Sequence, residues 1–374
     1  MKVIIYNINS FGGNYEYAKY LYEAYKNNPF VDSAALLMPE NAVYNKPGVL
    51  RFLCTDLPGT QNKFFKKIHY LYRSLVNPFK LLSFLKKQPS SVVIFNDFDQ
   101  RTAWFWAPFF KPLKKKHQFA VILHDPDRDK FFSVKSLSET SMSSIMSFMD
   151  VAFFHGFLPD KPYYNYSFKR VDIPHGIYDD TDIDNTVYEQ IKQEAAGDKI
   201  IGILGNIRDE KNYNVVIDAL KHMNNVKLLI AGKAANSGVS TDVYKQYAAE
   251  KCVSHKIIWK EGYLTQGAFN ACITACDIVL LYYKPSFTSQ SGVLNTIAPF
   301  KKRLIISNAE SSLRKSVEQY TLGRVLPHDQ PILLAKAVEE LLSLSDDHFS
   351  AGWNNYITNS SWQKHVSIAV EAFK

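Results

Sequence analysis

Short apolar runs that end in polar residues recur along the first half of the chain. They cover residues 2–8, 91–97, 119–125, 151–156 and 171–176. Continuous apolar runs of this length are typical of parallel strands that helices cover on both faces. The segment 15–27 has helical spacing and follows the first run after a glycine turn. The pattern therefore predicts a doubly wound α/β domain over residues 1–178.

The second half repeats this alternation. Strands are expected at 199–206, 226–233, 256–263, 277–283, 302–308 and 323–327. Helices are expected between them, including helices from about Thr241, Thr265 and Gly292. We expect a second doubly wound domain over residues 195–358, joined to the first by the polar, acidic segment 176–195. Residues 360–374 have the spacing of an amphipathic helix.

Length and composition agree with two soluble domains. The chain has 374 residues, 46% of them hydrophobic, which is long for one hydrophobic core. No apolar run reaches the ~18–20 residues that a membrane span needs. The N-terminal stretch has no cleavable small-residue site, so we expect no signal peptide. Cys54, Cys252, Cys272 and Cys276 form no C-x-x-C pair and are expected to be thiols in a reduced, cytoplasmic setting.

Most of the excess positive charge lies in the first half. The net charge is +8, and residues 1–180 hold 23 Lys and Arg against 16 Asp and Glu. Segment 61–88 has seven of these cations, no acid, and many interleaved aromatic residues, and Pro78 is expected to divide it into two amphipathic pieces. This composition favours peripheral contact with an anionic membrane; a core-packed helix with a solvated basic face is the alternative. The contact residues would be Lys63, Lys66, Lys67, Arg73 and Lys80.

Ligands of α/β sheets bind beyond the carboxyl ends of the strands, so the residues there are candidates for a site. Gly12 and Gly13 follow the first strand and allow a ligand close to the backbone, although a plain tight turn is equally compatible. His124 ends another strand, where it can bind a hydroxyl or a phosphate or serve as a structural histidine. The acids after it and the N-D-F-D stretch (96–99) have spacings common in turns, so we expect no metal site.

Two further candidates follow strands of the second domain. Arg208 and Lys211 are expected in the first turn of a helix, where cations oppose the helix dipole unless an anion is bound. A solvated helix start, with Asp209 and Glu210 as partners, is the alternative. The run S-F-T-S-Q-S-G (286–292) offers hydroxyls and backbone N–H groups at another helix start. A Ser or Thr cap explains one residue of this run, whereas two anion sites together predict a nucleotide-diphosphate site.

These motifs resemble those of GT-B glycosyltransferases of the family 4 type, the glycosyl transferases group 1. The matching stretches are G-N-I-R-x-x-K-N (205–212), L-I-A-G (229–232), E-G-Y (261–263), D-I-V-L-L-Y-Y (277–283) and Q-S-G-V-L…A (290–298). The resemblance implies two Rossmann-like domains that face each other across a cleft. It also implies that helix 360–374 crosses back to the first domain.

The resemblance also assigns roles to residues. Lys211 would hold the donor diphosphate, with Arg208 replacing an arginine that the family often has at Asn206. Gly12 and Gly13 would close over donor and acceptor, and His124, with Asp125 beside it, would be the catalytic candidate near the sugar. Further donor-binding candidates are Tyr263, Thr288, Ser289, Gln290, Ser291, Gly292, Val293 and Thr296.

One departure bears on the stereochemistry. The family has two glutamates separated by seven residues, and Thr288 and Thr296 stand at those positions. Retention of the anomeric configuration is carried over from the family as an expectation. If the reaction instead inverts, Asp125, Asp127 or His124 would be the base.

The sequence therefore predicts an enzyme that moves a sugar from a nucleotide-diphosphate donor, without a cofactor or a metal, to a glycan or lipid-linked acceptor. Surface polysaccharide synthesis in the cytoplasm, at the inner face of the membrane, is the expected setting. The alternatives are a sugar-nucleotide epimerase of the same fold and an inactive sugar-nucleotide-binding relative. A nucleic-acid-binding protein would fit the pI near 9.0, but no motif of that class is present.

Overall fold

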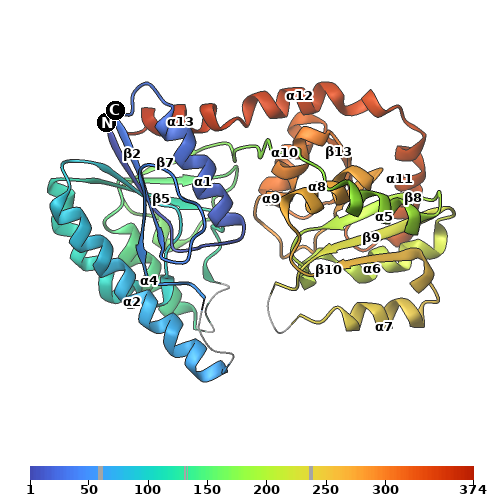
Figure 1. Ribbon diagram of the computed structural model, residues 1–374, viewed down its shortest axis with the longest axis horizontal. Coiled ribbons are helices and arrows are strands. Elements are labelled where there is room, and N and C mark those ends of the chain that lie inside the picture. The colour runs from blue at the N-terminus through green and yellow to red at the C-terminus, as the bar shows by residue number, and fades with distance from the viewer. Residues whose placement is uncertain (58–61, 130–131, 133, 236–238) are drawn as a thin grey trace. The chain divides into compact units, whose positions relative to one another are not determined.

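The computed structural model of the chain describes residues 1–57, 62–129, 132, 134–235 and 239–374. The chain divides into two compact units (Figure 1). Unit 1 comprises Met1–Gly176 and Ser361–Lys374, and unit 2 comprises Ile177–Ser360. The C-terminal segment thus packs with the N-terminal domain, although the chain reaches it from unit 2.

Unit 1 is built on a parallel seven-stranded sheet in the order β3-β2-β1-β4-β5-β6-β7. The strands are β1 (Lys2–Tyr6), β2 (Ser33–Pro39), β3 (Val49–Leu53), β4 (Val92–Phe95), β5 (Gln118–Leu123), β6 (Val151–Phe154) and β7 (Lys169–Asp172). The helices are α1 (Gly13–Lys26), α2 (Lys63–Lys87), α3 (Ala103–Trp106), α4 (Lys135–Met146) and α13 (Trp362–Glu371). In α1 the buried residues Ala18, Leu21, Tyr22 and Tyr25 recur at helical spacing, which fixes the face that packs on the sheet.

Unit 2 has a parallel six-stranded sheet in the order β10-β9-β8-β11-β12-β13. The strands are β8 (Lys199–Leu204), β9 (Val226–Gly232), β10 (Ile257–Glu261), β11 (Ile278–Leu281), β12 (Arg303–Ser307) and β13 (Gly323–Leu326). The helices are α5 (Asn185–Ala195), α6 (Tyr213–Ala219), α7 (Asp242–Glu250), α8 (Gln266–Ala275), α9 (Gly292–Ile297), α10 (Ser312–Tyr320), α11 (Pro331–Ser343) and α12 (Ser350–Asn359).

Both sheets confirm the predicted doubly wound α/β class. In each, the first three strands run outward in one direction and the next strands run outward in the other, as in a dinucleotide-binding fold. The order reverses between β1 and β4 in unit 1, and between β8 and β11 in unit 2. The loops after these four strands are therefore the places where each unit is expected to bind a ligand.

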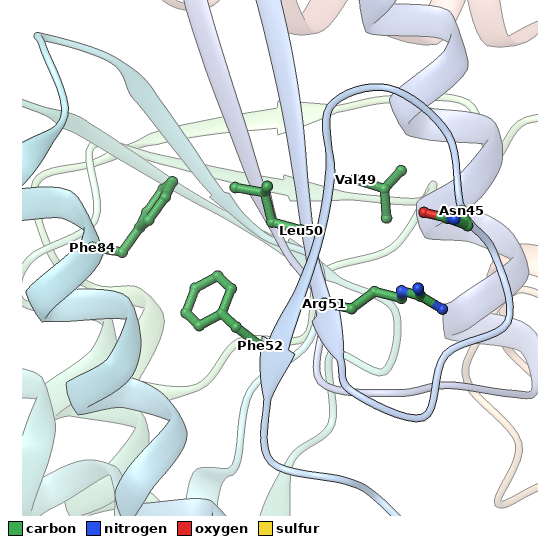
Figure 2. A pocket seen from close by; sticks show the side chains of 6 residues that line it. All are labelled: Asn45, Val49, Leu50, Arg51, Phe52 and Phe84. Carbon is green, nitrogen blue, oxygen red and sulfur yellow. The ribbon is translucent and has the colours of Figure 1, made fainter.

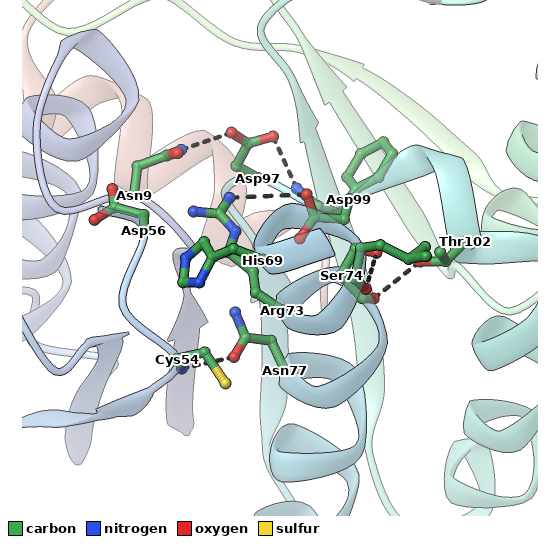
Figure 3. Close-up of polar contacts among 12 residues, drawn as sticks. Asn9, Cys54, Asp56, His69, Arg73, Ser74, Asn77, Asp97, Asp99 and Thr102 are labelled. Carbon is green, nitrogen blue, oxygen red and sulfur yellow. Dashed lines mark hydrogen bonds and ion pairs between the residues drawn. The ribbon is translucent and has the colours of Figure 1, made fainter. Parts of the chain in front are cut away.

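Helix α2 differs from the prediction, because it runs unbroken through Pro78. A proline inside a helix leaves the carbonyl four residues earlier without its usual N–H donor. That carbonyl belongs to Ser74, and the hydroxyl of Thr102 donates to it at 2.9 Å (Figure 3). A side chain from the next layer thus replaces the missing hydrogen bond, and the helix continues.

The segment expected as a joint also differs, because residues from Asn185 onward form α5. Ile191 and Ala195 of this helix are buried in the core of unit 2. Cys272 and Cys276 lie in the same core as free thiols, as predicted. Among the described residues, no helix is long and apolar enough to cross a membrane.

Candidate functional site

In unit 2 the candidate donor residues follow β8 and β11, on either side of the point where the strand order reverses. After β8 the chain forms a single 3₁₀ turn, Asp209–Lys211. Helix α6 starts only after Asn212, whose left-handed φ of 56° separates the turn from the helix. The expectation that Arg208 and Lys211 lie in the first turn of that helix is therefore wrong.

Lys211 is the most unusual residue of this turn, because its side chain is buried. Only 4% of the residue is exposed, and its Nζ donates to the carbonyl of Leu204. Burial, and secondly the charge of Arg208, lower the pKa of this ammonium group well below its usual value. Among the described residues, no carboxylate forms an ion pair with it. A bound anion would supply the missing counter-charge.

Arg208 lies beside Lys211 and is only partly neutralised. One guanidinium nitrogen, Nη1, is 3.4 Å from Glu210, and the buried Nε has no hydrogen-bond partner among the described residues. Asp209 instead pairs with Lys284 at 2.6 Å. Of the two cations, only Arg208 therefore pairs with a neighbouring acid, Glu210. Asp209 and Glu210 do not neutralise Lys211.

Gly205 connects this turn to the loop after β11. Its φ is 87°, and a Cβ at this position would lie 3.0 Å from Val293 and 3.4 Å from the Nζ of Lys211. Gly232, at the end of β9, packs in turn against the carbonyl of Gly205, where a Cβ would lie only 2.3 Å from the oxygen. The two motifs that the sequence separates by some 80 residues thus meet at one place.

The hydroxyl-rich loop before α9 contributes a buried wall. Ser289 and Ser291 are buried, and the Oγ of Ser291 lies 3.1 Å from the hydroxyl of Tyr283. The ring of Tyr283 stacks on Phe287 with centroids 3.9 Å apart. These contacts order the loop next to Val293.

The side chain of Gln290, a predicted donor-binding residue, is bonded within unit 2. Its side-chain amide donates to Ser316 at 3.2 Å and to the hydroxyl of Tyr356 at 3.4 Å, both inside unit 2. A contact of this residue with a donor would therefore have to come from its backbone. The side chain is held by the packing between α10 and α12.

The remaining predicted donor residues follow strands at the same edge of the sheet, and their contacts do not show whether they bind a donor. Asn206 and Gly292 are exposed, and Tyr263 is 77% exposed after β10. The hydroxyl of Thr296 donates to the carbonyl of Gly292, and the carbonyl of Thr288 accepts from the backbone N–H of Ser312. Neither threonine offers the charge of the glutamate that it replaces.

In unit 1 the glycine loop is fastened at both ends. Asn9 and Asn14 both donate to Asp97, at 2.7 and 2.9 Å, and Figure 3 shows the bond from Asn9. The backbone N–H of Ser10 donates to Asp56 at 2.7 Å. Between these anchors the glycines at 12 and 13 are exposed, with no atom within 4 Å of the position that a Cβ would take. The loop is therefore anchored by hydrogen bonds on both sides and presents open backbone at the glycines.

His124 lies in a cluster of histidines around Tyr17 of α1. The ring centroids of His124 and His175 lie 4.4 and 5.0 Å from that of Tyr17, and His155 and His365 lie 5.7 Å from it. Burial holds the pKa of His124 and of His175 well below the usual value, and lowers that of His155 to about 4 and that of His365 to about 3. The four imidazoles are therefore neutral at pH 7.

The acids that follow His124 are used within unit 1. The ammonium group of Lys161 lies 3.0 Å from Asp127 and 2.7 Å from Asp129. Asp125 is half-buried directly after the histidine. Among the described residues, no group of three or more His, Cys, Asp or Glu side chains has the arrangement of a metal site.

Of the predicted membrane-contact residues, Arg73 is buried and Lys80 is bonded to the edge strand β3. Arg73 is only 6% exposed, and its guanidinium lies 3.7 Å from Asp99, whose pKa burial raises to about 6 (Figure 3). The ammonium group of Lys80 donates to the carbonyl of Phe52 at 2.6 Å. Arg73 thus lies among the buried residues of α2, whereas Lys80 is half-buried beside β3.

A separate pocket of about 410 Å³ lies at the edge strand β3 (Figure 2). It is lined by Asn45, Val49, Leu50, Arg51, Phe52 and Phe84. It lies along the strand rather than at the carboxyl end of the sheet, so it is distinct from both candidate regions.

Sequence reasoning missed the residues that hold the site together. Asp56 and Asp97 anchor the glycine loop, although Asp97 had been noticed only as one half of an Asp-x-Asp pair. The repeated asparagines at 7, 9 and 14 around the glycine turn were a signal for such a network, since asparagine side chains readily bond to nearby backbone. The role of Lys284 left no signal in the sequence.

The fold is that of an α/β protein of two Rossmann-like units, and the second unit has two neighbouring cations, Arg208 and Lys211, at the edge of its sheet. Residues 184–359 match the family described as Glycosyl transferases group 1. The chain therefore has the GT-B fold, and just under half of it, the greater part of unit 2, matches the group 1 glycosyltransferases. No curated protein sequence matches it.

Solved structures with the same fold are remote in sequence. HepE of Anabaena, in complex with UDP and glucose, has a TM-score of 0.72 at 12% identity, with 100% of both chains covered. Sucrose-phosphate synthase of Thermosynechococcus elongatus has a TM-score of 0.70 at 14% identity, covering 99% of this chain and 96% of its own. Trehalose-6-phosphate synthase OtsA has a TM-score of 0.72 at 10% identity, covering 100% and 99%.

Proposed function

We propose that the enzyme transfers a hexose-type sugar from a nucleotide diphosphate to a glycan or lipid-linked acceptor in surface polysaccharide synthesis. The observation that carries the donor assignment is the buried ammonium group of Lys211. A lysine without a carboxylate partner in a protein interior is costly, and the diphosphate would remove this cost. The unpartnered Nε of Arg208 supports the same position for the anion.

Catalysis would rest on the leaving diphosphate. The ammonium group of Lys211 and the guanidinium of Arg208 would stabilise the negative charge that develops on it, without a metal ion. Backbone around Ser291–Val293 would complete the site, with Ser289 beside it. We infer that unit 1 binds the acceptor at the glycine loop and His124. Retention is the stereochemistry proposed.

The test is a transfer assay with product analysis. UDP-glucose is the first donor to use, because HepE was solved with it. Release of UDP, together with a glycosylated product when lipid-linked sugar acceptors are added, would support the proposal. Conversion of the donor to an isomeric sugar without any acceptor would identify an epimerase. Tight nucleotide binding without either reaction would identify an inactive relative.

Peripheral membrane contact is the second part of the proposal, and the exposed face of α2 supports it. Phe65, Ile68 and Tyr72 are 56, 47 and 58% exposed and follow one another at helical spacing, opposite the buried face. Lys63 and Lys67 are exposed in the first turns of the same helix. An amphipathic helix of this kind lies in the interface of an anionic bilayer. Such a position would bring a lipid-linked acceptor to unit 1 at the cytoplasmic face.

Co-sedimentation with vesicles tests this contact. We expect binding to vesicles that contain phosphatidylglycerol at low salt, and loss of binding in Phe65→Ser with Tyr72→Ser. Ile332→Ser is the matched control, since Ile332 is 54% exposed in unit 2. Equal sedimentation of both variants, or no binding by the wild type, would refute the membrane contact.

A further inference from the structure

The side-chain amide of Asn96 lies between the glycine loop and His124. Its Nδ2 donates to the backbone carbonyl of Asn14 at 2.9 Å and to the Oδ1 of Asn7 at 3.1 Å. Its Oδ1 lies 3.1 Å from the Nε2 of His124. The residue is completely buried directly after β4, next to the point where the strand order reverses.

These contacts fix the orientation of the amide. A backbone carbonyl can only accept a hydrogen bond, so the NH₂ end of Asn96 must face Asn14. The Nδ2 of Asn7 donates to the carbonyl of Asn9 at 2.7 Å, which leaves the oxygen of Asn7 to accept from Asn96. The carbonyl oxygen of Asn96 consequently faces His124.

The orientation of Asn96 determines which nitrogen of His124 carries the proton. An amide oxygen requires a donor, so the Nε2 of the imidazole is protonated. Because burial keeps the ring neutral, its Nδ1 holds a lone pair. Among the described residues, Nδ1 has no hydrogen-bond partner, and it is not enclosed by protein atoms. A neutral ring in this state can accept a hydrogen bond there but cannot donate one.

In the other three histidines of the cluster, the proton is on Nδ1 instead of Nε2. Their Nδ1 atoms lie 2.9, 3.0 and 2.8 Å from the backbone carbonyls of Ile173, Gly176 and Pro174. Each of these neutral rings must donate from Nδ1 to a carbonyl. The three residues are His155, His175 and His365. Of these four histidines, only His124 has its protonated nitrogen set by a side chain, that of Asn96, rather than by a backbone carbonyl.

We propose that Asn96 is a positioning residue that makes His124 an acceptor for a substrate hydroxyl. A sugar hydroxyl donates to such a nitrogen, whereas a carboxylate or phosphate oxygen has no proton to give and is repelled. The enzyme therefore takes a sugar with a free hydroxyl at this point rather than a uronic acid carboxylate or a phosphate. The substrate part of this inference rests on the proposed function; the protonation state of His124 does not.

Nuclear magnetic resonance of the full chain labelled with nitrogen-15 tests the protonation states. Long-range proton–nitrogen correlations at pH 7.5 distinguish the two neutral forms of each imidazole. We expect His124 with the proton on Nε2 and the other three cluster histidines with it on Nδ1. The cluster signals are assigned by single His→Gln variants. A wild-type His124 with its proton on Nδ1 would overturn the proposal.

Two variants of Asn96 separate positioning from packing. Asn96→Ala removes the acceptor, so a substantial share of His124 should move its proton to Nδ1, and kcat should fall about 10-fold or more with the Kd for UDP unchanged. Asn96→Asp keeps an acceptor for Nε2 and should restore the original proton position and part of kcat. The cluster histidines other than His124 serve as the control for folding, since their carbonyl partners are untouched.

The outcomes are distinguishable. An unchanged His124 in Asn96→Ala, or a changed His124 with unchanged kcat, would refute the positioning role. If the wild type transfers no sugar from any donor, the proposed function fails, the substrate part fails with it, and the correlation spectra still decide whether Asn96 sets the state of His124. With UDP-glucose as the donor, equal kcat/KM for a glucoside acceptor and for the matching glucuronide would contradict the selection of a hydroxyl.

Discussion

The two units share a strand order and differ in the chemistry at the point where that order reverses. In unit 1 the position is held by amides, carboxylates and a neutral imidazole, joined from Asp97 through Asn14 and Asn96 to His124. In unit 2 it holds two cations, one of them buried and without a carboxylate partner in the part of the chain that the structure describes. The same backbone topology thus presents hydrogen-bond acceptors in one unit and positive charge in the other. A neutral polyol and a diphosphate fit these two edges respectively.

The largest expected effect comes from removing the buried charge of unit 2. Lys211→Met should lower kcat/KM about 100- to 1000-fold, the range for losing one donor to a developing negative charge. The free energy of unfolding should stay the same or rise, because burial lowers the pKa of this ammonium group in the folded state. Steady-state kinetics and urea unfolding measure the two quantities. A large loss of stability would make Lys211 a structural residue.

The next largest effect is on stability, and it should differ between a packed glycine of unit 2 and an open glycine of unit 1. Gly232→Ala places a Cβ 2.3 Å from the carbonyl oxygen of Gly205 at a φ of 144°, so it should destabilise unit 2 by about 1–3 kcal/mol. Gly13→Ala meets open space and should change stability by less than about 0.5 kcal/mol while slowing transfer. Urea unfolding and kinetics give the comparison. Equal destabilisation by both would show that the loop of unit 1 is packed rather than open.

A smaller effect concerns pH and unit 1 alone. The pKa of His155 falls from 6.5 to about 4 on folding, and that of His365 to about 3, both mainly by burial. Below pH 6.5 the unfolded chain binds protons that the folded unit does not, so the free energy of unfolding falls as the pH drops from 6.5 towards 4. The loss from His155 is on the order of 3 kcal/mol. Hydrogen exchange followed peptide by peptide should show earlier opening of α13 and β6 than of β8 and β9, and His155→Gln should reduce the difference.

The sequence was sufficient for the architecture because apolar runs and glycine turns are local signals. It placed the strands of unit 2 and the residues Arg208, Lys211 and Val293 that the structure brings together. It failed where tertiary contacts override local rules. Pro78 does not break α2 because Thr102 supplies a donor, and Arg73 is buried because Asp99 lies across from it. Neither partner is near in sequence.

The polar networks were equally hidden. Gln290 belongs to a motif whose neighbours line the edge, yet its amide is bonded inward to Ser316. In the sequence, Asn96 only ends an apolar run. Its three hydrogen bonds in the structure show that it orients the ring of His124. Side-chain direction at a strand end depends on which partners other strands supply, and a single sequence does not contain that arrangement.

The central claim is that a diphosphate is the missing counter-ion of Lys211. Calorimetric titration with UDP, GDP, CDP, ADP and dTDP, first without metal and then with magnesium, tests it on the wild type, on Lys211→Met and on the exposed control Lys221→Met. The account predicts selective binding without metal that weakens by about 1.5–3 kcal/mol in Lys211→Met and is unchanged in the control. Equal affinity of Lys211→Met and the wild type for the preferred nucleotide would contradict it.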